Sequence, residues 1–182
     1  KDIRSSVVTL IPQTPFLFSG TLRMNLDPFN EYSDKQIWEV LEQVHLKKAC
    51  MDFPNKLKYI VSDQGSNLSA GQQQLLCVAR ALLRGSKIIL LDEATANVDS
   101  ATDTLIQETI QSAFKDATTI TIAHRLDTVM ISDRILVMDD GRVSEYDTPG
   151  NLLKNKDGIF YGLVKEWNSK NEDLLIEPKR YK

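Results

Sequence analysis

The apolar run over residues 88–91, which ends in Asp92 and Glu93, limits the possible folds more than any other segment. A strand that is apolar at every position has both faces covered, which is typical of parallel sheets flanked by helices. Two further strand-like segments occupy residues 6–11 and 118–123, and helical patterns alternate with them. This alternation predicts an α/β fold built on a parallel sheet covered by helices.

Capping signals mark where the main helices begin. Ser33 and Ser69 are each followed three residues later by a glutamine, Gln36 and Gln72, which is the capping-box pattern. The second of these helices is expected to end near Gly85. The other predicted elements are helices over 100–114, 125–130 and 159–170, a short helix from Thr148 and Pro149, a hairpin with strands 134–138 and 143–146, and irregular stretches over 14–27 and 52–65.

Composition narrows the class of protein. A length of 182 residues fits one domain, and 42% hydrophobic with 26% charged residues is ordinary for a soluble globular chain. The net charge of -3 gives no reason to expect a nucleic-acid partner.

Cys50 and Cys77 form neither a disulfide framework nor a metal-ligand spacing, which favours a reduced cytosolic compartment. No apolar run approaches the roughly 18 residues that a transmembrane helix needs, so a role at a membrane would require a partner segment outside this sequence.

Two acids follow the most apolar strand. Ligands of open α/β sheets bind at the carboxyl ends of the strands. Asp92 is therefore well placed to hold Mg²⁺ through water beside phosphate oxygens, and Glu93 to polarise an attacking water or accept its proton. The competing interpretation is an ordinary strand that stops at two solvated acids.

Two further features are ambiguous when taken alone. The helix that starts at Ser69 offers free backbone amides and a hydroxyl, and Gly71 permits close approach of the backbone, so its N-terminus suits an anion. His124 directly follows a predicted strand and can reach a terminal phosphate or orient a water. A plain helix start and a surface histidine are the competing interpretations, and for His45 the surface interpretation is preferred.

The order and spacing of the motifs decide between these interpretations, because the chain resembles the ABC ATPase family over roughly residues 3–165. In that family's terms Gln13 matches the Q-loop, residues 68–72 (LSAGQ) the signature and residues 88–92 the Walker B strand. Glu93 matches the catalytic glutamate, residues 96–99 the D-loop, and His124 the switch histidine.

The resemblance extends to a subfamily. Residues 20–23 and 25–29 (GTLR and NLDPF) and residues 102–107 look like the multidrug-resistance-associated (C) subfamily. The intact Glu93 and the imperfect signature resemble the second, C-terminal nucleotide-binding domain of that subfamily.

The resemblance implies a partial nucleotide-binding domain over residues 1–170. Its α/β core would comprise 1–13 and 86–170, its helical subdomain about 14–85, and residues 171–182 a polar tail. ATP and Mg²⁺ would bind between two such domains paired head to tail. The implied roles are catalytic for Glu93, His124 and Gln13, metal binding for Asp92 and Gln13, and nucleotide binding for Ser69, Ala70, Gly71, Gln72 and Asp99.

The implied setting is the cytoplasmic face of a membrane, the plasma membrane in particular. The helical subdomain would receive a coupling helix from transmembrane domains. The implied activity is ATP hydrolysis that drives export of organic anions, conjugates or drugs.

Three departures from the family pattern stand out. The phosphate-binding motif G-x-x-x-x-G-K-[ST] occurs nowhere in the 182 residues, so we expect Walker A and the first strands to precede Lys1 and the isolated chain to bind ATP weakly or not at all. Ala70 replaces the first signature glycine, so this signature would serve the weaker of two sites and Glu93 the hydrolysing one. Gln73 stands where many members carry a basic residue.

Two other functions stay open. One is a non-transport ABC ATPase. Chromosome-type members insert a long coiled coil between Q-loop and signature, whereas here 54 residues without heptads separate Gln13 from Leu68. Translation-type members have basic surfaces, which the net charge of -3 does not favour. The other is an inactive truncated chain.

Overall fold

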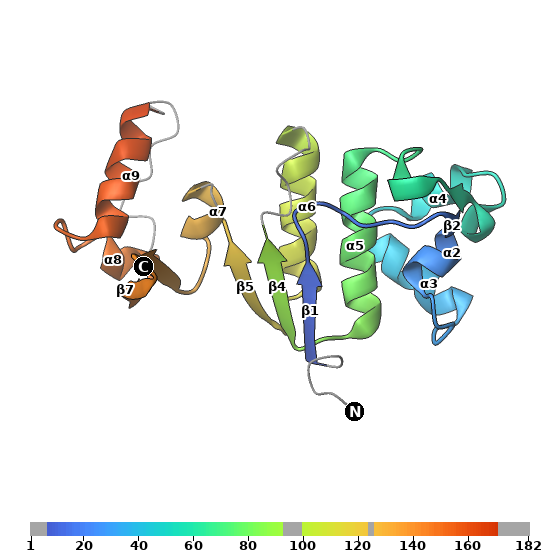
Figure 1. Cartoon of the computed structure of the whole chain (residues 1–182), viewed down its shortest axis with the longest axis horizontal. Coiled ribbons are helices and arrows are strands. Elements are labelled where there is room, and N and C mark those ends of the chain that lie inside the picture. The colour runs from blue at the N-terminus through green and yellow to red at the C-terminus, as the bar shows by residue number, and fades with distance from the viewer. Residues whose placement is uncertain (1–6, 93–99, 124–125, 171–182) are drawn as a thin grey trace. The chain divides into compact units, whose positions relative to one another are not determined.

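The computed structural model describes residues 7–92, 100–123 and 126–170 (Figure 1). Glu93, residues 96–99 with Asp99, His124 and the predicted tail lie outside the described residues. The chain divides into two compact units, residues 1–122 and 123–182, and each is described by itself.

A three-stranded parallel sheet forms the centre of the first unit. Its order is β1 (Val8–Ile11), β4 (Ile88–Asp92) and β5 (Thr118–Ile122), with β4 in the middle. One face is buried through alternate residues such as Ile11, Ile89 and Leu91, while Leu10 and Ile120 on the other face are exposed. The predicted strands and their parallel direction are confirmed. The expectation that both faces of the sheet are covered is wrong for the described residues, because the described helices bury only one face and every residue of β5 is exposed.

Helices α5 (Ala70–Arg84) and α6 (Ser100–Ala113) belong to the same hydrophobic core as the buried face of the sheet. The capping box of Ser69 and Gln72 that starts α5 is confirmed. Helix α5 ends where Gly85 adopts φ +61°, a left-handed conformation that favours glycine. The chain then turns directly into β4. As a result the N-terminus of α5 lies at the carboxyl end of the sheet (Figure 1).

The regular structure between β1 and α5 consists mainly of short helices. It contains β2 (Gly20–Thr21), α2 (Leu22–Leu26), α3 (Asp34–Gln43), α4 (Lys47–Asp52), η1 (Lys56–Lys58), β3 (Ile60–Val61) and η2 (Asp63–Gly65). Strands β2 and β3 pair in antiparallel orientation. The predicted capping box of Ser33 and Gln36 is confirmed. The boundaries of the helical subdomain, 14–85, stay a prediction.

The expectation of an irregular stretch over residues 14–27 is wrong for its second half. Helix α2 forms there because the Thr21 Oγ1 accepts a hydrogen bond from the Met24 amide at 3.1 Å. Leu22 and Leu26, four residues apart, point into the core. Gly20 and Pro28 flank this five-residue helix and do not interrupt it.

The second unit contains α7 (Leu126–Met130), β6 (Ile135–Asp139), β7 (Arg142–Asp147), α8 (Pro149–Leu152) and α9 (Ile159–Lys170). The predicted hairpin is confirmed, with Asp140 and Gly141 both at positive φ, as a tight two-residue turn requires. The predicted Thr148 cap of α8 is confirmed as well. Ile135, Val137, Phe160 and Val164 lie in the hydrophobic core of this unit.

Candidate nucleotide-binding site

The carboxyl ends of the parallel strands bring two of the predicted site residues to one edge. Ile11 pairs with Leu91, so β1 and β4 end side by side. Asp92 is the last residue of β4 and is exposed, and Gln13 follows β1 by two residues and is also exposed. An exposed carboxylate and an exposed amide therefore occupy adjacent strand ends.

Asp92 and Gln13 present the oxygen donors that Mg²⁺ prefers. Mg²⁺ in phosphate-transferring proteins keeps several waters and takes only one or two carboxylates besides phosphate oxygens. Within residues 7–92, 100–123 and 126–170, no three His, Cys, Asp or Glu side chains gather into a metal cage. The single exposed carboxylate of Asp92 fits a metal that shares its coordination with phosphate and water.

The hydroxyl of Ser69 accepts a hydrogen bond that caps its helix and still has a proton to donate. Its Oγ accepts from the Gln72 amide at 3.2 Å, and the Gln72 Oε1 accepts from the Ser69 amide at 2.9 Å. No described residue accepts the Ser69 hydroxyl proton. In the equivalent box at Ser33 that proton is donated to the Gln36 Oε1 at 2.8 Å. Ser69 is thus able to donate to an anion at the helix N-terminus.

The two small residues of the signature have different surroundings. Ala70 is exposed, whereas Gly71 is buried. A Cβ on Gly71 would lie 2.4 Å from the Thr102 Cγ2 on α6. Gly71 is therefore required for the close contact of α5 with α6. This role is separate from the close approach of the backbone to an anion that the sequence predicts. That contact could not be inferred from a sequence in which Thr102 is 31 residues away.

Gln73 has a role that the sequence did not indicate. Its Nε2 donates to the carbonyls of Gly65 and Leu68 at 3.0 and 3.1 Å. Gly65 has φ +71°, and a Cβ there would lie 2.6 Å from the Leu17 Cδ1. The loop before the signature is thus held by Gln73 on one side and packed against Leu17 on the other.

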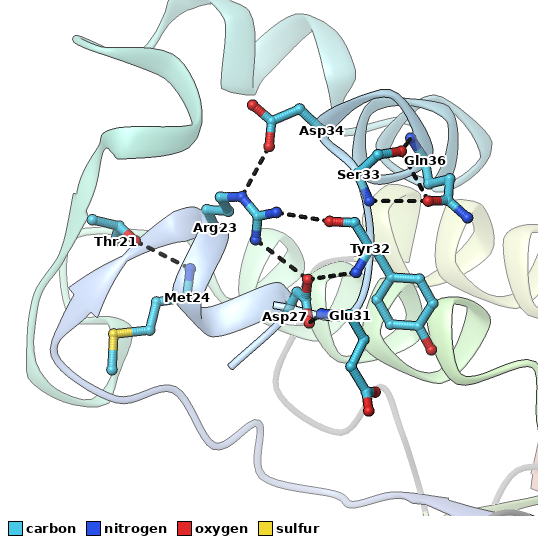
Figure 2. A network of polar contacts seen from close by, with 9 residues as sticks. All are labelled: Thr21, Arg23, Met24, Asp27, Glu31, Tyr32, Ser33, Asp34 and Gln36. Atoms are coloured by element: carbon cyan, nitrogen blue, oxygen red, sulfur yellow. Dashed lines mark hydrogen bonds and ion pairs between the residues drawn. The ribbon is translucent and has the colours of Figure 1, made fainter. Parts of the chain in front are cut away.

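Arg23 and Asp27, both within the subfamily-like stretch, organise the loop after α2 (Figure 2). The buried Asp27 carboxylate accepts from the amides of Glu31 and Tyr32 at 3.0 and 2.9 Å. Arg23 donates to Asp27 at 3.3 Å, to the Tyr32 carbonyl at 2.7 Å and to Asp34 at 2.9 Å. This network fixes residues 27–34 as a compact turn between α2 and α3.

The pKa of Asp27 lies below its ordinary value of 3.8. Burial alone would raise this pKa, but the two amides and the Arg23 guanidinium outweigh burial by favouring the charged form. Because the folded-state pKa is the lower one, the stabilisation is complete above the unfolded-state pKa. It is lost as the pH falls through the folded-state pKa.

A pocket of about 310 Å³ lies beside this turn, between β1, α2 and α5. Its aromatic lining residues are Phe16, Phe18, Phe29 and Tyr32, and Arg80 forms part of its wall. Phe16 and Phe29 are 68% and 76% exposed. Phenylalanine residues that are this strongly exposed around a pocket are typical of a surface that binds another molecule.

The chain belongs to the ABC transporter family, whose model matches residues 1–96. Curated members of the predicted subfamily are similar to this chain over 90% or more of its length. It is 50% identical to mouse ATP-binding cassette sub-family C member 4 over 176 residues, which is 97% of this chain and 13% of that protein. It is 56% identical to Caenorhabditis elegans multidrug resistance protein mrp-7 over 163 residues, which is 90% of this chain and 11% of that protein.

A third relative is rat ATP-binding cassette sub-family C member 3, 55% identical over 165 residues, which is 91% of this chain and 11% of that protein. The predicted fold class and subfamily are confirmed, while assignment to the second domain stays a prediction. The chain spans about an eighth of the length of these relatives. Among the helices that the structure describes, none is long and apolar enough to cross a membrane.

Proposed function

We propose that this chain is part of the ATP-binding and ATP-hydrolysing domain of an ABC-type exporter of organic anions, conjugates or drugs. The observation that carries the proposal is the exposed Asp92 carboxylate at the carboxyl end of the central strand, next to the strand that leads to Gln13. Family membership and the relatives named above support it. The domain would work at the cytoplasmic face of the plasma membrane.

Each site residue has a distinct proposed role. Asp92 and Gln13 would hold Mg²⁺, which when bound neutralises charge on the phosphates of ATP. Glu93 would orient the attacking water and accept its proton, and His124 would contact the terminal phosphate.

A second domain of the same kind would complete the site. The hydroxyl of Ser69 and the amides of Ala70, Gly71 and Gln72 would bind the nucleotide held by that domain. Asp99 would link the two domains.

The aromatic pocket is the proposed contact with the transmembrane part. A coupling helix from that part would insert an apolar side chain between Phe16 and Phe29. The exposure of these two rings supports this occupant, because burying them would stabilise a permanent contact within one protein.

The test is an Asp92→Asn variant in the full-length transporter. We expect ATP hydrolysis to fall by about 100-fold or more, since the amide cannot replace a metal-binding carboxylate. Asp116→Asn is the matched control. Asp116 is exposed and precedes β5, so it lies at the opposite, amino end of the strands. Near-normal hydrolysis by the Asp92 variant would contradict the proposal.

Transport is measured separately, as ATP-dependent uptake of an anionic conjugate into inside-out membrane vesicles. Hydrolysis without uptake of any organic anion would favour a non-transport ABC ATPase.

A further inference from the structure

One arginine joins the signature helix to the segment that follows Gln13. The Arg80 Nε donates to the Asn25 carbonyl at 2.6 Å, Nη1 to the Phe16 carbonyl at 2.5 Å, and Nη2 to the Asn25 Oδ1 at 2.9 Å. The guanidinium also lies 5.8 Å from the centroid of the Phe18 ring, within the range of a cation–π contact. These partners are 55 to 64 residues away in the sequence, so Arg80 links separate segments.

The acceptors of Arg80 are themselves held in place. Asn25 is 1% exposed, and its side chain also accepts from the Phe18 amide at 3.1 Å and donates to the Phe18 carbonyl at 2.9 Å and the Thr21 carbonyl at 3.2 Å. The positions of the Phe16 and Asn25 oxygens therefore match the planar fork of an arginine, which the single ammonium of a lysine cannot reproduce.

The charge of Arg80 makes a purely stabilising role a poor explanation. Its acceptors are uncharged, and no described carboxylate is hydrogen-bonded to it. Placing a cation in a partly buried site without an opposite charge costs free energy, which its hydrogen bonds to neutral oxygens offset only in part.

A second attachment lies on the other side of the same segment. Leu17 is 1% exposed and packs against Gly65, where an added Cβ would lie 2.6 Å from the Leu17 Cδ1. Gln73 on α5 holds the Gly65 carbonyl. Residues 16–18 are thus attached to α5 directly through Arg80 and indirectly through Gly65.

We propose that Arg80 is a positioning residue that makes the Gln13 loop and the signature helix move as one body. Phe16 is three residues after Gln13, and Arg80 is about three helical turns after Ser69. A displacement of Gln13 by nucleotide passes through Phe16 to Arg80, and from Arg80 along the rigid helix to the signature. This inference rests on the function proposed above.

The experiment compares Arg80→Met, Arg80→Lys and Arg142→Met in the full-length transporter, with Mg-ATP as the substrate of hydrolysis. Arg142 is exposed on β7 and serves as the control, with unchanged kinetics. For Arg80→Met we expect kcat per folded molecule to fall by about tenfold or more while KM changes less than about twofold, because Arg80 orders the site without touching ATP. Arg80→Lys is expected to be intermediate. If the methionine variant does not fold, the lysine variant carries the test.

The amount of folded transporter is measured by size-exclusion chromatography for each variant. A wild-type kcat per folded molecule, with only the folded yield reduced, overturns the inference because Arg80 would then be structural. A rise in KM with unchanged kcat also overturns it. If the wild-type transporter hydrolyses no ATP, the proposed function itself fails and this inference fails with it.

Discussion

Gly71 is the residue at which the signature meets the rest of its own domain. We expect Gly71→Ala to destabilise the protein by about 1–3 kcal/mol, since the new methyl group would overlap the Thr102 Cγ2. Adding Thr102→Ser should restore much of the lost stability. Serine lacks the Cγ2, and the next nearest atom, the Thr102 Cβ, lies at 3.7 Å, an ordinary contact. The measurement is the midpoint of thermal unfolding of the full-length single and double variants.

Gly162→Ala is the matched control for that pair. Gly162 is an exposed helical glycine of α9, and nothing lies within 4 Å of an added Cβ. Alanine there should leave the midpoint unchanged or raise it slightly, because alanine favours helices over glycine. Equal effects of the two glycine substitutions, or no rescue by Thr102→Ser, would show that the contact with α6 does not restrict Gly71.

At the scale of elements, α3 and α5 begin with the same motif and provide a matched comparison. Ser33→Ala and Ser69→Ala each remove one capping box, so each should cost about 1 kcal/mol of stability. Only Ser69→Ala should also weaken retention of radiolabelled Mg-ATP by the full-length transporter, by about tenfold. Its hydroxyl proton is available to a phosphate, and a hydrogen bond to a charged group contributes roughly 1.5–3 kcal/mol. Equal ATP retention by the two variants would argue against a contact of Ser69 with nucleotide.

The local signals explain which elements could be predicted from sequence. Capping boxes, the Asp140–Gly141 turn and the apolar run of β4 act within a few residues, so their patterns indicate structure directly. The short helix α2 is hard to predict because Gly20 and Pro28, which flank it, are strong signals for irregular structure, whereas the Thr21 cap precedes only five helical residues. Motif spacing predicts the roles of Asp92, Gln13 and the signature for the same reason: each motif is defined by its neighbours in the chain. Those roles stay predictions.

The residues that sequence reasoning missed act across long separations. Arg80 reaches Asn25 and Phe16, and Thr102 restricts Gly71 from another helix. A single sequence contains no signal for such pairs, since neither partner is unusual in its own segment. Gln73 acts over a shorter separation, because it donates to carbonyls of the loop just before its own helix. The identity of the side chain alone does not reveal these hydrogen bonds.

At the scale of the whole molecule, the proposed pairing of two domains separates two nucleotide sites. The chain would contribute Glu93 to the hydrolysing site and the LSAGQ signature to the weaker one. This division predicts that Glu93→Gln lowers the steady-state ATP turnover of the full-length transporter by about 10²–10⁴-fold, because the water loses its general base. Ala70→Gly restores the usual signature but changes only the weaker site, so turnover should stay close to that of the wild type. Turnover that persists near normal in Glu93→Gln, or falls as steeply in Ala70→Gly, would mean that the two motifs of this chain do not serve different sites.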